Sequence, residues 1–183
     1  MMRTMIVTET ELPDAYVIDL EPVEDPRGFF ARAWSDRELA ERGLDTRIAQ
    51  CNVSLTKRSG TVRGMHFQRP PREESKFVRC TAGGLYDVIV DLRPDSAAFR
   101  RWIGVELSQE NRRTLYVPRG FAHGFQTLAD DTEVSYMISE AYAPESADGV
   151  RWDDPAFSIV WPLGDPTEIS DKDRTWPDFT GRS

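Results

Sequence analysis

Apolar and polar residues alternate over several short stretches of the chain, which is the period of a half-buried β-strand. These stretches cover residues 16–20, 46–53, 85–92, 102–107, 114–117 and 132–138. Turn-forming groups rich in Gly, Pro, Ser or Asp separate them, at residues 25–28, 59–60, 83–84 and 118–120. Many short strands at regular spacing predict an all-β antiparallel sandwich or barrel.

One short helix is predicted near the N-terminus. Ser35 and Glu38 form a capping-box pattern that opens a helix, and Gly43 is expected to close it. The chain from residue 143 onward is rich in Pro, Asp and Trp, so we expect turns and short helical pieces that wrap the barrel. No internal repeat or linker divides the sequence, which predicts one domain over residues 1–183.

Composition narrows the function classes. The net charge of −8 argues against a nucleic-acid binder, whereas an anionic small molecule needs only a local group of cations. The two cysteines, Cys51 and Cys80, lack metal-ligand spacing and are expected to be reduced and buried. No apolar run reaches the length of a signal peptide core or a membrane span, so a cytoplasmic protein is expected.

The two histidines occupy different sequence contexts. His123 ends a P-x-G-x-x-H run that resembles the second motif of the cupin barrel. His66 is followed by Gln68, where a metal-binding cupin usually has the second histidine of H-x-H. A three-histidine site cannot be assembled, which predicts a barrel without metal. A two-histidine site completed by Glu74 or Glu106 is the alternative.

A cationic stretch at residues 63–79 stands out in this acidic chain. Arg69 and Arg72 are expected to be solvated. Arg63 and Lys76 flank apolar β stretches and are candidates for holding a phosphate or an oxyanion, with a solvated position as the alternative.

Strict strand alternation places Arg63 and His66 on opposite faces of their strand. Both side chains can reach one pocket only if the backbone is irregular between them. Gly64 is a natural position for a bulge, so we predict an irregularity there.

Collinear segments along nearly the whole chain resemble the dTDP-4-dehydrorhamnose 3,5-epimerase family. They are RGFF at 27–30, QCN at 50–52, RGMHFQ at 63–68, KFVRC at 76–80, LYDVIVDLR at 85–93, VPRGFAHGF at 117–125, the segment 136–142, GVRWDDP at 149–155 and SDKD at 170–173. The resemblance implies a cupin jelly roll, that is, a double-stranded β-helix, which forms a homodimer. It also implies inversion at C3 and C5 of dTDP-4-keto-6-deoxyglucose through an enolate, without a cofactor.

The resemblance also assigns roles to individual residues. His66 is the implied base, oriented by Asp173; Tyr136 is the acid on the opposite face, and Lys76 steadies the enolate oxygen. These residue types suit the chemistry, because histidine titrates near neutrality and an enolate needs a fixed positive group beside its oxygen. The residues implied to hold the nucleotide diphosphate, the base and the sugar are Arg27, Gln50, Asn52, Arg63, His123, Tyr142 and Lys172.

Several of these assignments have structural alternatives. Tyr136 alternates with apolar neighbours and suits an inward core position, and Asp173 suits a turn cap. Asp87 and Asp91 share one face of a predicted strand, and either is an alternative partner for His66. Tyr142 by default would pack in the core or an interface.

Two positions depart from the family pattern, which has glutamate at both: Arg32 and Ala147. The changes leave the proton-transfer residues intact and bear on which sugar nucleotide is used. The rival functions are a metal-dependent cupin oxygenase, a non-catalytic sugar-nucleotide-binding cupin, and an epimerase that acts at one centre or on another nucleotide-linked 4-keto sugar.

Overall fold

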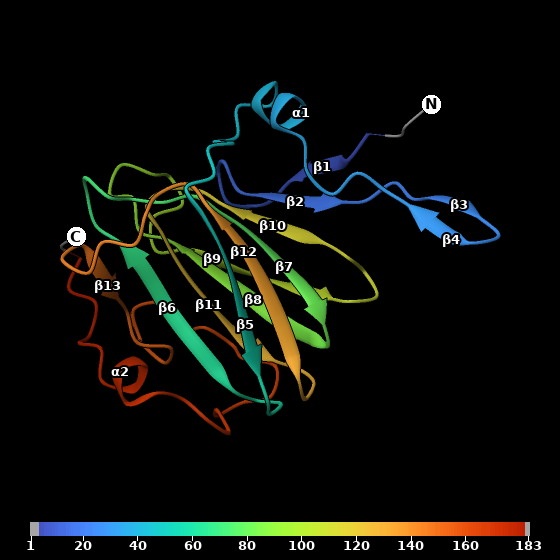
Figure 1. Cartoon of the computed structure of the whole chain (residues 1–183). Coiled ribbons are helices and arrows are strands. Elements are labelled where there is room, and N and C mark those ends of the chain that lie inside the picture. The colour runs from blue at the N-terminus through green and yellow to red at the C-terminus, as the bar shows by residue number, and fades with distance from the viewer. Residues whose placement is uncertain (1–3, 182–183) are drawn as a thin grey trace.

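A computed structural model describes residues 4–181 as two antiparallel sheets packed face to face, with a small separate hairpin (Figure 1). The six-stranded sheet has the order β1 (Ile6–Glu9), β2 (Tyr16–Asp19), β10 (Thr114–Val117), β7 (Lys76–Ala82), β12 (Thr132–Ile138) and β5 (Gln50–Thr56). The five-stranded sheet has the order β13 (Ala147–Gly149), β6 (Val62–Gln68), β11 (Phe121–Thr127), β8 (Gly84–Asp91) and β9 (Trp102–Ser108). The hairpin pairs β3 (Val23–Asp25) with β4 (Gly28–Phe30), and the two helices are α1 (Asp36–Ala40) and α2 (Asp171–Arg174).

The predicted all-β jelly roll is confirmed. The alternating stretches at residues 114–117 and 132–138 coincide with β10 and β12, and those at 16–20, 85–92 and 102–107 differ from their strands by one residue at one or both ends. The largest shift is in β5, which begins at Gln50 because its pairing with β12 starts opposite Ile138. Residues before it turn away, and Ile48 packs beneath α1 instead. Neither helix within residues 4–181 is long and apolar enough to cross a membrane.

The main core fills the space between the two sheets. It is built from inward-facing residues that include Val78, Leu85, Ile89, Leu115, Phe125 and Val134. In β8 the alternate residues Val88 and Val90 face outward, where Phe157 and Trp161 of the C-terminal segment cover them. The predicted wrapping of the barrel by this segment therefore has a physical cause: a strand apolar on both faces needs a second cover.

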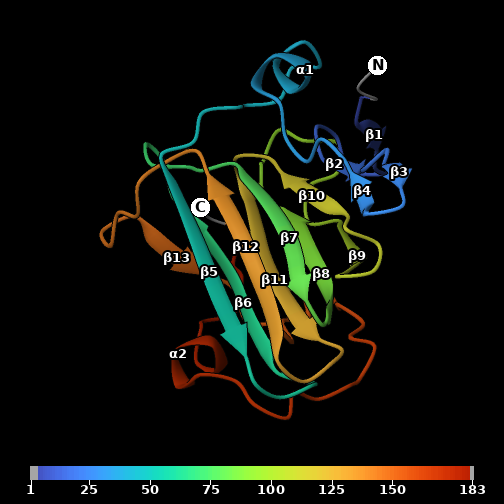
Figure 2. The ribbon, with the colours of Figure 1, turned by 45° about the vertical axis from the view of Figure 1, so that its right-hand side comes forward.

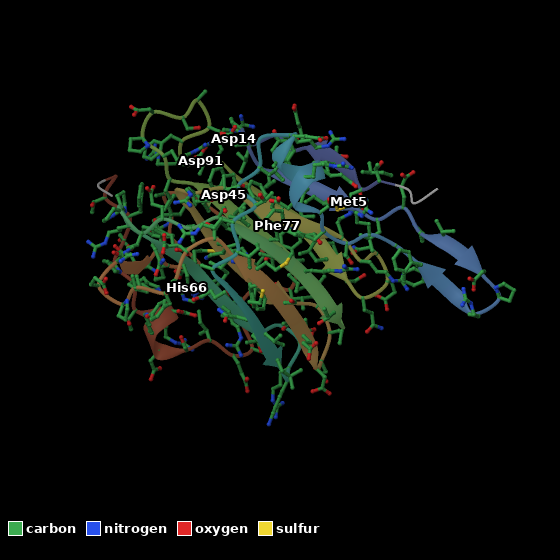
Figure 3. All side chains as sticks on the ribbon, turned by 45° about the horizontal axis from the view of Figure 1, so that its top comes forward. Met5, Asp14, Asp45, His66, Phe77 and Asp91 are labelled. Carbon is green, nitrogen blue, oxygen red and sulfur yellow. The ribbon has the colours of Figure 1, made fainter. Side chains whose placement is uncertain are left out.

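The outer face of the six-stranded sheet is covered only in part. Leu39 of α1 packs with Met5 and Phe77, both labelled in Figure 3, and the Ser35 hydroxyl caps the helix by accepting from the Glu38 N–H. The prediction that both thiols are buried is wrong for Cys51, which points outward from the edge strand β5 and is exposed. Cys80 on β7 points into the core and is buried.

The predicted irregularity in β6 is confirmed. His66 pairs with His123 and Arg63 pairs with Phe125. The step from Arg63 to His66 is three residues along β6, whereas the matching step along β11 is two, so β6 contains one extra residue. Gly64 has a φ of +128°, and its Cα lies so close to Gly124 that a Cβ there would come within 2.5 Å of the Gly124 Cα. The Gly64–Met65 peptide is cis. This bulge turns both Arg63 and His66 toward the space between the sheets.

The bulge predicts that Gly64→Ala destabilises the fold severely, because the new Cβ meets backbone that cannot yield. Gly43→Ala is the control, since Gly43 also has a positive φ, +82°, a Cβ added to it would meet nothing within 4 Å, and it lies outside the β3–β4 hairpin. The control should lower the free energy of unfolding by roughly 1–3 kcal/mol, through the strained backbone conformation alone. Gly64→Ala should lower the free energy of unfolding, measured with urea, by at least about 2 kcal/mol more than the control does. Equal costs for the two variants would contradict the close approach of Gly64 and Gly124.

Candidate active site

A cavity of about 900 Å³ opens between the two sheets and is lined by residues of β5 and β6. These two strands lie on the same side of the sandwich (Figures 1 and 2). A smaller hollow of about 340 Å³ adjoins it. We call these the larger and the smaller lobe. The residues that line both are Asn52, His66, Lys76, Ile138 and Lys172.

His66 is held by the predicted partner. Its Nε2 lies 2.7 Å from Oδ1 of Asp173, and the Gly64 N–H donates to the other carboxylate oxygen at 3.2 Å. Asp173 belongs to α2, whose N-cap is Ser170, and Figure 3 places His66 beside that C-terminal segment. The alternative that Asp173 serves only as a turn cap is therefore wrong.

The Asp173 carboxyl is ionised. Burial alone would raise its pKa, but the hydrogen bond and charge of His66 and the hydrogen bonds from Gly64 and Ser170 lower the pKa below its ordinary value. A carboxylate only accepts hydrogen bonds, so His66 donates from Nε2. The imidazole side chain is 44% exposed and lines both lobes, which leaves Nδ1 for a ligand.

Tyr136 faces the larger lobe from the opposite sheet. Its hydroxyl lies 3.0 Å from the Ser54 Oγ, and its ring meets that of His123 edge-on at 6.4 Å. Burial raises the pKa of Tyr136 to about 12, so the phenol keeps its proton at neutral pH. The residue also packs against the main core, so the core position and the place in the cavity coexist.

Asp87 and Asp91, the alternative partners for His66, are occupied elsewhere. Asp87 lies 2.7 Å from Nε2 of His123, within the pair of adjacent strands β8 and β11. Asp91 accepts from Arg93 and Ser96 near the far end of β8. Each histidine thus has its own aspartate, and the His123–Asp87 pair was not predicted from the sequence.

Two cations reach the cavity as predicted. Arg63 lines the larger lobe, where its Nε donates to Thr56 Oγ1 at 3.0 Å. Lys76 lines both lobes, and its Nζ lies 3.1 Å from Oε1 of Glu74. The larger lobe also contains Lys172 and Arg174.

Basic side chains outnumber acidic ones in the larger lobe. The carboxylates among its lining residues are those of Glu168 and Asp173, and the second is bound to His66. The larger lobe is therefore suited to an anionic ligand, although the whole chain carries a net charge of −8.

The smaller lobe contains Gln50 and Tyr142, two more of the predicted ligand-binding residues. Gln50 accepts the Tyr142 N–H at 3.2 Å, and the Tyr142 ring is exposed beside it. Lys172 lines both lobes, and its Nζ lies over the Trp176 ring, 5.2 Å from the ring centre. Ala147 also lines the smaller lobe, so this departure from the family pattern lies within ligand reach.

Arg27 and Arg32 do not line either lobe of their own chain. Arg27 is exposed at the turn of the β3–β4 hairpin and pairs with Asp25. Arg32 forms an ion pair with Glu38 of α1. The family-pattern departure at Arg32 is therefore separated from the cavity within one chain.

The residues of the alternative metal site do not converge. Glu106 is exposed on β9 and outside the lining of both lobes, and Glu74 is bound to Lys76. Across residues 4–181, no three His, Cys, Asp or Glu side chains are grouped as metal ligands.

The lowered pKa of Asp173 has a consequence for stability. A carboxyl whose pKa is lower in the folded state stabilises the fold above its unfolded value of about 3.9 and loses this effect as the pH falls through the folded value. The wild type should therefore exceed Asp173→Asn in free energy of unfolding at pH 5, and the difference should shrink at pH 3. Urea unfolding at both pH values measures it, with Asp171→Asn, exposed on the same helix, as the control. A difference that is the same at both pH values would contradict the assignment.

Comparison with known proteins agrees with the resemblance found in the sequence. The family model described as dTDP-4-dehydrorhamnose 3,5-epimerase matches residues 9–181. An epimerase of that name from Methanothermobacter thermautotrophicus is 44% identical over 170 residues, which cover 92% of this chain and 91% of the relative.

Solved structures agree as well. A dTDP-4-dehydrorhamnose 3,5-epimerase from Bacillus anthracis, with TDP and PPi bound, superimposes with a TM-score of 0.92 at 42% identity, covering 96% of this chain and 100% of that one. An epimerase from Legionella pneumophila in complex with dTDP-4-keto-L-rhamnose has a TM-score of 0.86 at 36% identity, with 93% and 90% covered. This chain belongs to the dTDP-4-dehydrorhamnose 3,5-epimerase family.

Proposed function

We propose that this chain inverts C3 and C5 of a dTDP-4-keto-6-deoxyhexose by proton abstraction and reprotonation, with protein side chains as the only catalytic groups. The observation that carries the proposal is the position of His66 and Tyr136 on facing sheets of one cavity. Inversion needs a base on one face of the sugar and an acid on the other. A sandwich with one such group on each inner face meets that need.

His66 is the proposed base. With Nε2 donating to Asp173, Nδ1 takes the proton from the carbon next to the C4 ketone. The imidazolium that forms is stabilised by the Asp173 carboxylate, and general-base catalysis of this kind contributes roughly 10²–10⁴-fold. The electron pair of the broken C–H bond moves into the enolate, whose negative oxygen is stabilised by the Lys76 ammonium.

Tyr136 is the proposed acid. Because its pKa is raised to about 12, it carries a proton at neutral pH and can deliver it to the carbon from the face opposite His66. Proton exchange with solvent then restores the imidazole and the phenol. Both C3 and C5 flank the same ketone, so one set of groups can serve the two centres in turn.

The basic side chains of the larger lobe account for binding of a nucleotide-linked sugar. We infer that Arg63 and Lys172 bind the diphosphate of a dTDP-sugar, together with Asn52 and His123, and their shared position in the larger lobe supports this. We infer that Gln50 and Tyr142 bind the base, because both line the smaller lobe and the exposed Tyr142 ring provides a stacking surface. The relatives with bound TDP and with dTDP-4-keto-L-rhamnose support this class of ligand. The cytoplasmic location and the absence of nucleic-acid binding remain predictions.

We also propose that the chain functions as a homodimer through the β3–β4 hairpin. A lone two-stranded hairpin is marginally stable in water, yet this one projects from the body of the fold (Figure 1) and exposes Val23, Phe29 and Phe30. Within residues 4–181, the ring contact made by its aromatic side chains is with the Arg112 guanidinium, 4.5 Å from the centre of the Phe29 ring. A second copy would cover this surface and bring Arg27 within reach of the partner's cavity.

Deuterium exchange tests the reaction. In D₂O with dTDP-4-keto-6-deoxyglucose, NMR should show deuterium at both C3 and C5. His66→Ala should lower exchange by about 10²-fold or more. Tyr136→Phe should lower inversion more than exchange, because the base on the first face is intact. Exchange at one carbon only would identify a mono-epimerase, and no exchange at either would overturn the proposal.

Two experiments test the proposed dimer, one on its assembly and one on the sharing of the site. Phe30→Ser should convert the dimer to a monomer in light scattering, since a polar side chain replaces the most exposed ring of the hairpin. Arg27→Ala and His66→Ala should each be impaired alone, and mixing them should restore activity through dimers that carry one intact site. A monomeric wild type, or no recovery on mixing, would rule out the shared site.

A further inference from the structure

Lys76 is held in place by one carboxylate. The Lys76 and Glu74 side chains are only 11% and 8% exposed, and Nζ lies 3.1 Å from Oε1 of Glu74. Among residues 4–181, Glu74 is the one group found in hydrogen-bond or ion-pair contact with this ammonium. Burying a lone ammonium is costly, and the ion pair offsets that cost.

This contact leaves the ammonium available for chemistry. An ammonium has three N–H donors, and Glu74 takes one of them. Lys76 lines both lobes of the cavity, so its other donors can reach a ligand oxygen at their junction. Glu74 thus fixes the direction of the side chain without saturating it.

The other oxygen of Glu74 argues against a purely structural role. Oε2 is buried, and no described residue donates a hydrogen bond to it. By contrast, both carboxylate oxygens of Glu140, which also lines the smaller lobe, have partners: Oε1 accepts from the Ala141 N–H and from Arg72, and Oε2 lies 3.7 Å from Nη1 of Arg47. A buried carboxylate oxygen without a protein donor lowers stability, so packing alone does not account for Glu74 at this position.

We propose that Glu74 is a positioning residue for the epimerase reaction, which holds the Lys76 ammonium at the point where the enolate oxygen forms. The inference rests on the proposed function. Glu74 does not touch the reacting atoms and acts through Lys76. Its loss should therefore lower kcat and leave the binding of the nucleotide largely unchanged.

Steady-state kinetics of single variants give the first test. Glu74→Ala should lower kcat by about 10²-fold, the size of effect that misplacing a catalytic group produces, and change KM by less than about 3-fold. Glu74→Gln should recover most of the loss, because its amide oxygen still accepts from the ammonium. Glu73→Ala is the matched control: Glu73 lines neither lobe, and its backbone carbonyl, which accepts from Arg119, is kept. Binding of dTDP reports the folded state, and Glu74→Met, which fills the volume, replaces the alanine variant if that variant fails to bind.

A double-mutant cycle gives the decisive test. In a Lys76→Gln background, the further change Glu74→Ala should have no additional effect on kcat, because the group through which Glu74 acts is gone. Unchanged kcat in Glu74→Ala, or an equal loss in both backgrounds, would overturn the inference. Exchange at C3 and C5 by the wild type is measured first. Its absence would count against the proposed function, whereas normal wild-type exchange with an unaffected Glu74→Ala would count against Glu74 alone.

Discussion

The extra residue of β6 opposite Gly124 is the constraint on which the site depends. Without it, Arg63 and His66 would face opposite sides of their sheet. The bulge brings both into the cavity and directs the Gly64 N–H to Asp173, whose carboxylate holds His66. Two glycines allow it, because neither Gly64 nor Gly124 has room for a Cβ.

The sandwich supplies the rest of the geometry. Residues that alternate into the gap between the sheets bring Tyr136 and Lys76 from one side and His66 and His123 from the other. Each catalytic side chain is fixed by a neighbour, as Tyr136 is by Ser54. An acidic protein thereby presents a locally basic larger lobe to an anionic ligand.

Local pattern and family resemblance predicted much of this arrangement. Alternation located most strands, and the conflict between the faces of Arg63 and His66 located the bulge. The pairing of Asp87 with His123 was missed, because it depends on β8 lying beside β11, and sheet order is a long-range property. Ser54 was missed because the strand was predicted to end at residue 53. The strand β5 in fact continues to Thr56, and alternation then puts Ser54 on the same inner face as Asn52. Glu74 lies just before β7, where no periodicity indicates the direction of its side chain.

The tautomer of His66 tests most directly the claim that the bulge and Asp173 prepare it as a base. The chain has two histidines, so ¹⁵N NMR of the imidazole nitrogens is simple to assign with a His123→Asn variant. We expect neutral His66 to carry its proton on Nε2, with Nδ1 unprotonated, and we expect Asp173→Asn to abolish this preference. A proton on Nδ1 in the wild type, or a tautomer that is insensitive to Asp173, would contradict the proposed role.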